Sequence, residues 1–307
     1  MKAVVMAGGE GSRLRPLTLG RPKPMVPVLD KPCIEHIFDL LKMHGITEVV
    51  VTVYYMAGVI QDYFGDGSDF GLKIHYAIEE TPLGTAGSVK NAQHLLDEPF
   101  IVISGDALTD INLSDVVSFH QEKGSKATLV LVRVENPLEY GVVITDDTGA
   151  IQRFLEKPSW GEVFSDTVNT GIYVIEPEAL DYLPAGGISD FSSDLFPMML
   201  EKGDPMYGYV APGYWCDVGN LSEYLRASFD LLQGKVKLPL SGSRRPNGVY
   251  TAGDVEIDPT ARTYGPVFLG QGSKILARAV IHGPAAIGDY TTLGEGATVD
   301  RSVIWSN

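Results

Sequence analysis

Hydrophobic residues in the first half of the chain alternate between short unbroken runs and stretches in which they recur every three or four positions. The runs at residues 1–7 (MKAVVMA) and 100–104 (FIVIS) are typical of strands buried on both faces. Apolar residues at helical spacing predict a helix over residues 34–44, which Gly45 would end. The same reasoning predicts further strands over 48–54, 73–78, 127–134 and 141–145, and helices over 58–64 and 88–96. This alternation favours an α/β domain with a mostly parallel sheet, whose ligands bind beyond the carboxyl ends of the strands.

The last fifty residues follow a different pattern, with a period of six. From Ile257 to Val299 every sixth residue is aliphatic apart from Thr263, and the fourth residue after each of these is small or β-branched. The aliphatic series is Ile257, Leu269, Ile275, Ile281, Ile287, Leu293 and Val299. Hexads that stay in register in this way predict a parallel β-helix of hexapeptide repeats.

The two patterns also predict the domain boundaries. We expect a first domain over residues 1–238, a linker with proline and glycine over 239–254, and the β-helix over 255–307. The repeats stop within a hexad at Asn307, so we expect either a longer natural protein or an open end that another subunit covers. Such a β-helix would serve assembly or regulation, and we expect a homo-oligomer formed through it.

Composition and charge exclude several classes of protein. The chain has 307 residues, of which 44% are hydrophobic, enough for two globular domains and too many for a disordered protein. No apolar run approaches the ~18 residues of a membrane helix, and the N-terminal run is too short for a signal peptide. Two distant cysteines, Cys33 and Cys216, form no disulfide or zinc pattern, so we expect a cytoplasmic protein. The net charge of −15 argues against nucleic acid and anionic membranes as partners.

The charge is locally reversed at the N-terminus. Residues 1–31 hold six basic and two acidic side chains, and they include the glycine-rich stretch Gly8-Gly9-Glu10-Gly11-Ser12-Arg13-Leu14. Leu14 replaces the third glycine of the dinucleotide fingerprint, and no Walker A lysine follows. Glycines still let backbone N–H groups surround phosphate oxygens, and arginine adds a charged donor fork. With Lys23 between two prolines, this region predicts a site for a polyanionic small molecule.

Residues 7–32, AGGEGSRLRPLTLGRPKPMVPVLDKP, resemble the signature of the sugar-1-phosphate nucleotidylyltransferases, which join a sugar 1-phosphate to an NTP and release pyrophosphate. The resemblance extends over about residues 1–230 and is greatest to the mannose-1-phosphate guanylyltransferases. Its further motifs are PLGTAG at 82–87, SGD at 104–106, EKP at 156–158, NTG at 169–171 and WCDVG at 215–219. It implies a Rossmann-like nucleotidyltransferase domain, followed by a short left-handed β-helix.

The reaction itself indicates what the residues do. A sugar 1-phosphate is largely dianionic at pH 7, so its oxygen can attack the α-phosphorus without a protein base. Positioning and electrostatics then supply most of the catalysis. The resemblance implies that Arg13, with the backbone of Gly8 to Ser12, holds the leaving phosphates and that Lys23 reaches the α-phosphate.

The resemblance also implies a Mg²⁺ cofactor held by Asp106 and Asp217, which with Arg13 and Lys23 form the catalytic set. Mg²⁺ takes one or two carboxylates together with phosphate oxygens. Asp110, close to Asp106 in sequence, is a residue that could be mistaken for the ligand.

The base preference depends on an acidic pair before Pro82. A carboxylate only accepts hydrogen bonds, so it suits the N1–H and N2–H₂ donors of guanine and repels pyrimidine carbonyls. Pyrimidine-using relatives commonly carry glutamine where this chain has Glu79, although strand alternation could direct Glu80 inward instead. The nucleotide-binding residues implied by the resemblance are Ala7, Gly8, Gly9, Gly11, Ser12, Arg13, Glu79, Glu80, Pro82, Gly84, Thr85 and Asp106.

The sugar phosphate would bind on the other side of the site. Gly141 would let a hexose approach the backbone, Glu156 and Asn169 would bind hydroxyls, and Lys157 would bind the phosphate. Nothing in the residues decides between mannose and glucose. The acidic pair favours GTP and the resemblance favours mannose 1-phosphate, with a UTP- or dTTP-dependent glucose-1-phosphate enzyme or a non-catalytic nucleotide-sugar-binding subunit as alternatives.

Overall fold

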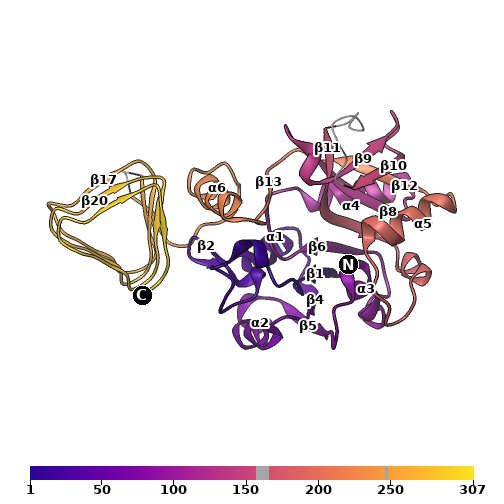
Figure 1. Ribbon diagram of the computed structural model, residues 1–307, viewed down its shortest axis with the longest axis horizontal. Coiled ribbons are helices and arrows are strands. Elements are labelled where there is room, and N and C mark those ends of the chain that lie inside the picture. The colour runs from indigo at the N-terminus through magenta and orange to yellow at the C-terminus, as the bar shows by residue number, and fades with distance from the viewer. Residues whose placement is uncertain (157–165, 246–247) are drawn as a thin grey trace.

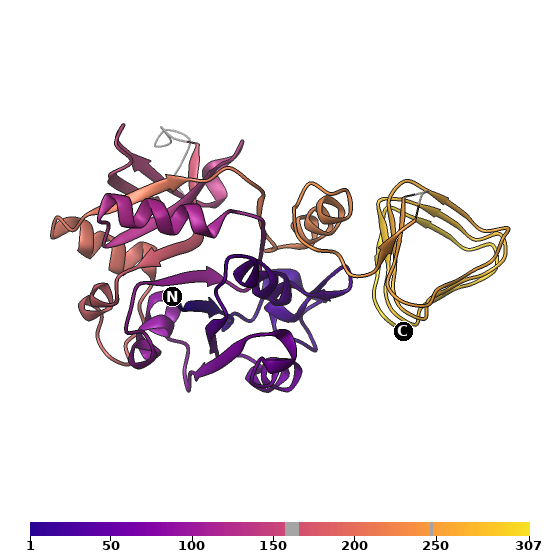
Figure 2. The same cartoon turned by 180° about the vertical axis from the view of Figure 1, so that it is seen from behind.

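The computed structural model describes residues 1–156, 166–245 and 248–307. An α/β domain lies on one side of the molecule and a three-sided β-helix on the other, with α6 (Leu221–Leu232) between them (Figure 1). The reverse view shows the same separation, with the N-terminus inside the α/β domain and the C-terminus on the β-helix (Figure 2).

The centre of the α/β domain is the strand β1 (Ala3–Met6). It lies between β4 (Glu48–Val53) and β6 (Phe100–Ser104), with β5 (Lys73–Ile78) beyond β4, and all four strands are parallel. Consecutive residues of β1 point to opposite faces, and both faces are buried in separate hydrophobic clusters. This explains why β1 and β6 are continuous apolar runs, whereas β5 at the edge of the sheet alternates.

Beyond β6 the sheet becomes antiparallel. β11 (Thr167–Ile175) pairs antiparallel with β6, β8 (Ala127–Arg133) and β9 (Gly141–Thr145). β10 (Ile151–Glu156) continues the sheet from β9, and β12 (Met206–Val210) pairs with β8. The described residues therefore form a mixed sheet of nine strands, with the predicted parallel arrangement in the N-terminal half of the domain.

Helices cover both faces of this sheet. Two of them agree with the predicted ranges to within one residue, whereas α3 begins at Gly84, four residues earlier than predicted. The remaining α-helices beside α6 are α1 (Cys33–Met43), α2 (Ala57–Phe64), α3 (Gly84–Asn91), α4 (Leu113–Lys123) and α5 (Phe196–Glu201). Short 3-10 helices cover Ser12–Leu14, Lys23–Met25, Ser68–Phe70, Gln93–Leu95, Pro137–Glu139 and Pro177–Tyr182, and Phe191–Leu195 forms a π-helical turn.

Two small strand pairs lie outside the main sheet. β2 (Pro27–Val28) pairs with β3 (Lys31–Pro32) in the segment that follows Lys23. β7 (Ala107–Thr109) pairs antiparallel with β13 (Trp215–Asp217), which brings together two motifs that are far apart in sequence.

The C-terminal region is a β-helix of three sheets, as the period of six predicts, and its strands are parallel apart from the first, Ser243–Arg244, which pairs antiparallel. Val249 pairs with Val267 and Val267 with Ala285, so one coil takes 18 residues, or three hexads. Its strands are β14 (Ser243–Arg244), β15 (Val249–Thr251), β16 (Glu256–Ile257), β17 (Arg262–Tyr264), β18 (Val267–Leu269), β19 (Lys274–Ile275), β20 (Val280–His282), β21 (Ala285–Ile287), β22 (Thr292–Leu293), β23 (Thr298–Asp300) and β24 (Val303–Ile304).

The first strands of the β-helix fall within residues 239–254, where the sequence predicts a linker. β15 already pairs with β18, because Val249 and Thr251 continue the hexad register. Thr251 takes the position that is aliphatic in most later hexads, and it is β-branched but polar. The β-helix also packs on the α/β domain, since Phe268 and Ala286 belong to the same buried cluster as the core around α1. Among the described residues, no helix is long and apolar enough to cross a bilayer.

Candidate active site

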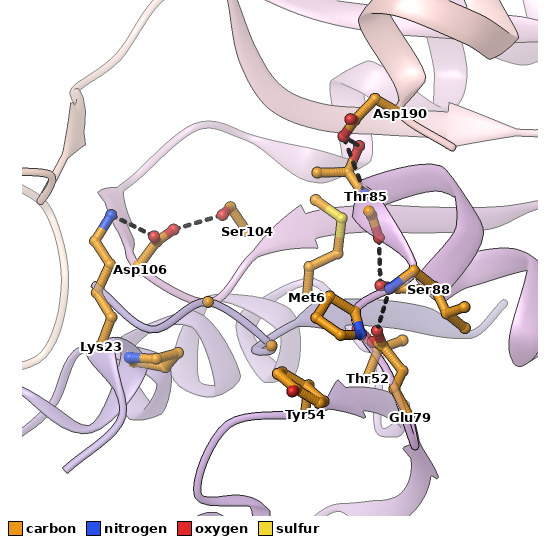
Figure 3. A pocket seen from close by; sticks show the side chains of 16 residues that line it. Met6, Lys23, Thr52, Tyr54, Glu79, Thr85, Ser88, Ser104, Asp106 and Asp190 are labelled. Carbon is orange, nitrogen blue, oxygen red and sulfur yellow. Dashed lines mark hydrogen bonds and ion pairs between the residues drawn. The ribbon is translucent and has the colours of Figure 1, made fainter. Parts of the chain in front are cut away.

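A cavity of about 320 Å³ opens where β1 and β6 end (Figure 3). Gly8 and Gly9 follow β1, Asp106 follows β6, and the Gly105 N–H donates to the Met6 carbonyl at 2.9 Å. The lining residues are Met6, Gly8, Gly9, Lys23, Pro24, Thr52, Tyr54, Glu79, Pro82, Leu83, Gly84, Thr85, Ser88, Ser104, Asp106 and Asp190. This is the edge of the sheet at which an α/β fold binds its ligands.

A second hollow of about 280 Å³ shares part of this lining, including Lys23, Thr85 and Asp106. Its other side is formed by Arg13, Ala107, Tyr140, Asn169, Thr170, Gly171, Tyr173, Trp215 and Asp217. The two hollows together form one continuous site, with Lys23 and Asp106 at their junction.

The junction is a triad of Lys23, Asp106 and Asp217. The β7–β13 pair places Asp217 opposite Ala107 and so beside Asp106. The Lys23 ammonium forms ion pairs with both carboxylates, one of them to Asp217 Oδ1 at 3.2 Å. The Ser104 hydroxyl donates to the other oxygen of Asp106, and Figure 3 shows Lys23 and Ser104 on opposite sides of this carboxylate.

The two carboxylates of this triad titrate differently. Burial alone would raise the pKa of Asp106, but the Lys23 charge and the Ser104 hydroxyl hold it below its usual range. Burial and the neighbouring Asp106 charge raise the pKa of Asp217, which Lys23 only partly offsets. Burial also disfavours the charged form of Lys23, but the two carboxylates raise its pKa above the usual value. Lys23 is therefore a fully charged ammonium at neutral pH.

The triad fits a divalent cation. The carboxylates of Asp106 and Asp217 converge on one positive charge, the Lys23 ammonium. A pair of carboxylates is the protein donor set that Mg²⁺ takes alongside phosphate oxygens and water. In the described parts of the chain no group of three or more histidine, cysteine or acidic side chains could enclose a metal. An ion held here would therefore complete its coordination from substrate phosphates and water.

The glycine-rich loop is fixed by its contact with Lys23. Gly11 has φ +66°, and a Cβ on it would lie 2.7 Å from the Lys23 Cβ, so only glycine fits. The Thr18 hydroxyl donates to the Gly11 carbonyl at 2.9 Å and closes the loop. Ala7 is buried, whereas Ser12 and Arg13 are exposed, with Arg13 directed into the second hollow.

Glu79 and Glu80 occupy different environments. Glu79 is 6% exposed, and its Oε2 accepts the Leu83 backbone N–H at 3.0 Å. Its Oε1 and the Thr52 hydroxyl are buried at the cavity without a hydrogen-bond partner among the described residues. Glu80 is exposed and is absent from the described lining of the cavity, so Glu79 is the one of the two glutamates that lies at the cavity.

Asp190 is a site residue that the sequence did not reveal. Its Oδ1 accepts the backbone N–H of Thr85 at 3.1 Å and the Thr85 hydroxyl at 2.7 Å. Figure 3 shows this pair at the edge of the cavity. The contact caps the first turn of α3 from a distant part of the chain, and no local pattern signals it. This remote cap explains why α3 begins four residues before the apolar periodicity does.

Three of the four predicted sugar-binding residues, Gly141, Glu156 and Asn169, lie on β9, β10 and β11. Gly141 and Asn169 line a small hollow together, and Asn169 also lines the second hollow. The Asn169 amide donates to Tyr173 Oη at 2.9 Å and to Ser192 Oγ at 3.3 Å. Glu156 ends β10 opposite Gly141, whereas Lys157 lies outside the described residues.

Asp110 accepts hydrogen bonds from the backbone and has a structural role. Its two carboxylate oxygens accept the backbone N–H of Tyr214 at 2.6 Å and of Lys237 at 2.8 Å. It thus ties β13 and the segment after α6 to the β7 turn. These backbone partners explain why it is not directed into either hollow.

Comparison with known proteins identifies the family of this site. The family described as nucleotidyl transferase matches residues 2–234. A UTP–glucose-1-phosphate uridylyltransferase from Synechocystis sp. is 39% identical over 99% of this chain and 83% of its own. A mannose-1-phosphate guanylyltransferase from Mycobacterium tuberculosis is 37% identical over 97% of this chain and 83% of its own. The chain is a sugar-1-phosphate nucleotidylyltransferase.

Solved structures of this family share the fold of the α/β domain. A putative glucose-1-phosphate thymidylyltransferase from Bacillus anthracis aligns with TM-score 0.68 and 26% identity, over 74% of this chain and 94% of its own. HddC from Yersinia pseudotuberculosis, complexed with GMP-PN, aligns with TM-score 0.66 and 25% identity, over 75% of this chain and 99% of its own. The nucleotidylyltransferase domain is thus nearly the whole chain in these neighbours.

Proposed function

We propose that this nucleotidylyltransferase uses GTP and mannose 1-phosphate to make GDP-mannose and pyrophosphate. The observation that carries the choice of base is the buried Glu79 carboxylate, which lines the cavity and whose Oε1 has no hydrogen-bond partner among the described residues. An ionised carboxylate accepts and does not donate, which matches the adjacent N1–H and N2–H₂ groups of guanine. The carbonyls of uracil or thymine would face this charge unfavourably.

The remaining groups act by position and charge. The sugar phosphate is its own nucleophile, so the protein must bring two polyanions together and stabilise the leaving pyrophosphate. In this proposal Lys23 binds the α-phosphate, and Arg13 with the glycine-rich loop binds the leaving phosphates. Mg²⁺, held by Asp106 and Asp217, would neutralise phosphate charge.

The sugar would occupy the side of the site formed by β9 and β11. Gly141 and Asn169 line the same hollow there, and we assign the sugar hydroxyls to Asn169 and Glu156 and the phosphate to Lys157. The choice of mannose rests on the Mycobacterium tuberculosis relative, which is named for this activity.

The decisive experiment measures kcat/KM for GTP, ITP and UTP with mannose 1-phosphate. ITP lacks the 2-amino group, and a buried acceptor left without its donor costs ~1–3 kcal/mol. We expect GTP to exceed ITP by about 10- to 100-fold, since tenfold corresponds to about 1.4 kcal/mol. Glu79→Gln should narrow the gap between GTP and UTP, because an amide both donates and accepts, whereas the exposed Glu80→Gln is the matched control. Equal use of GTP and ITP by the unmodified enzyme would remove the carboxylate argument.

One alternative substrate pair has a specific observation in its favour. The Synechocystis relative, 39% identical over nearly the whole chain, is named for UTP and glucose 1-phosphate. A pyrophosphate-release assay over a grid of four NTPs against mannose and glucose 1-phosphate separates the two functions. A chain that binds nucleotide-sugars but releases no pyrophosphate with any pair would instead be a non-catalytic subunit.

A further inference from the structure

The last coil of the β-helix reaches the segment that carries Lys23. The Trp305 indole N–H donates to the Tyr224 hydroxyl at 2.7 Å, and that hydroxyl donates to the Pro27 carbonyl at 2.9 Å. The Arg21 guanidinium lies 4.7 Å from the centroid of the Trp305 ring, a cation–π contact. Trp305 therefore contacts Arg21 directly and Pro27 through one hydroxyl.

These contacts lie on both sides of Lys23. Arg21 precedes it by two residues, Pro27 follows it by four, and Lys23 is the first residue of the 3-10 helix between them. Tyr224 belongs to α6, which Figure 1 shows between the β-helix and the α/β domain, beside β2. Trp305 and Val303 also pack against the main buried cluster, so the contact continues the hydrophobic interface between the two domains.

We propose that Trp305 is a positioning residue for nucleotidyl transfer, acting through Tyr224 and Arg21 to fix residues 21–27 and thereby the Lys23 ammonium. The proposal rests on the phosphate-binding role assigned to Lys23 above. It gives the β-helix a part in the chemistry although Trp305 itself touches neither hollow in the described part of the chain.

The local structure explains why residues 21–27 need contacts from outside the segment. We call the contacts of Trp305 and Tyr224 with Arg21 and Pro27 the brace. Residues 21–27 contain three prolines, which lack a backbone N–H and so anchor the chain through fewer hydrogen bonds. The following strand pair β2–β3 is only two residues long on each side. Lys23 must nevertheless meet two carboxylates and a phosphate, and a displacement of ~1 Å at such a site can cost ~100-fold in rate.

The position of Trp305 predicts a specific kinetic signature. Lys23 interacts with charge that develops at the transferred phosphate, so misplacing it removes an interaction of the transition state more than of the ground state. Loss of the brace should therefore lower kcat and leave the KM values for both substrates nearly unchanged. A general loss of stability would instead lower the active fraction and the melting temperature together.

Two variants of the full chain test the brace, with a matched control. Trp305→Leu removes both contacts, and Tyr224→Phe removes only the shared hydroxyl and keeps the buried ring. Tyr264→Leu removes an aromatic ring that is 54% exposed on another sheet of the β-helix. We expect about a tenfold fall in kcat for Trp305→Leu, a smaller fall for Tyr224→Phe and none for Tyr264→Leu. Hydrogen–deuterium exchange should quicken over residues 19–30 in the first two variants and stay unchanged in β1 and β4.

Measuring both kcat and hydrogen–deuterium exchange separates the role of Trp305 from the phosphate-binding role of Lys23 on which it rests. If Trp305→Leu fails to fold, Tyr224→Phe alone decides by the same two measurements. Unchanged kcat and unchanged exchange over residues 19–30 in a folded brace variant would overturn the proposal, even if Lys23→Ala abolishes turnover. Full turnover by Lys23→Ala would overturn the assigned role of Lys23, while faster exchange in the brace variants would still show that Trp305 holds the segment.

Discussion

Lys23 is only 9% exposed, yet it carries a full charge between two carboxylates that are far apart in sequence. Burying a charge is unfavourable unless it is paired, so the three side chains depend on one another. These three residues could be singled out from the sequence through the family resemblance of their motifs, since lysine and aspartate suit phosphate and metal binding. Their mutual contact could not, since it depends on the pairing of β7 with β13.

The carboxylates should matter far more for turnover than for stability. We expect Asp106→Asn and Asp217→Asn each to lower kcat by at least about 100-fold, the scale of lost electrostatic preorganisation, with activity dependent on Mg²⁺. Asp110→Asn is the control, because its partners are backbone N–H groups. That variant should unfold at a lower temperature but retain turnover when folded. Near-normal kcat in a folded Asp106→Asn or Asp217→Asn enzyme would contradict the metal assignment.

His36 predicts a pH dependence of stability that is separate from the chemistry. It is fully buried, its Nε2 lies 3.0 Å from the Val28 carbonyl, and burial together with Lys31 lowers its pKa to about 4. Between pH ~6.5 and ~4 the unfolded chain binds a proton that the folded chain does not, so the free energy of unfolding falls as the pH falls. The difference between pH 7 and pH 5 should be about 2 kcal/mol from this residue, at ~1.36 kcal/mol per pH unit.

Urea unfolding at several pH values checks this expectation. His36→Gln keeps a donor near the Val28 carbonyl but does not titrate, so it should show a shallower loss of stability below pH 6.5. Identical pH dependence in the two proteins would mean that the pKa of His36 is the same in the folded and unfolded chains.

At the scale of elements, hydrophobic periodicity predicted the core of the fold. The strands β5, β6 and β9 have the predicted bounds, and each is followed directly by glycine or an acidic residue. The start of α3 could not be predicted, since Asp190 caps it from a distant part of the chain. The sequence left Glu79 and Glu80 as alternatives, because the direction of a side chain at a strand end depends on the fold, and in the structure Glu79 is buried and Glu80 exposed.

The glycine-rich loop gives an element-scale prediction. Gly11→Ala would force a side chain into the left-handed region and into contact with Lys23 Cβ, so we expect lower kcat and destabilisation of about 1–3 kcal/mol. Gly20→Ala in the same segment is the control, because an added Cβ there would meet no described heavy atom within 4 Å. Steady-state kinetics and thermal melts of both variants check this. Equal activity in the two variants would show that the loop accommodates the side chain without moving Lys23.

At the scale of the whole molecule, the sequence predicted two domains but not how closely they join. The hexad register identified the β-helix, and an 18-residue coil follows directly from three hexads. The interface could not be predicted, because Phe268 and Ala286 occupy positions that the repeat leaves open. Trp305 continues the aliphatic series of the repeat, but Ile304 rather than Trp305 pairs with Ile287, and Trp305 packs against the main buried cluster instead. Their burial depends on the surface of α6 and on the segment after Lys23.

A chain that ends after Leu240 tests the division into domains. Solved neighbours consist almost wholly of the α/β domain, and the groups assigned to the chemistry lie before this point, so we expect a folded protein that binds nucleotide. Without Trp305 its kcat should fall as in Trp305→Leu, about tenfold, and light scattering should show a smaller oligomer than the full chain forms. Full activity of the shortened enzyme would contradict the positioning role of Trp305. Complete loss of turnover in a folded, nucleotide-binding protein would mean that the β-helix supplies a group to the active site itself.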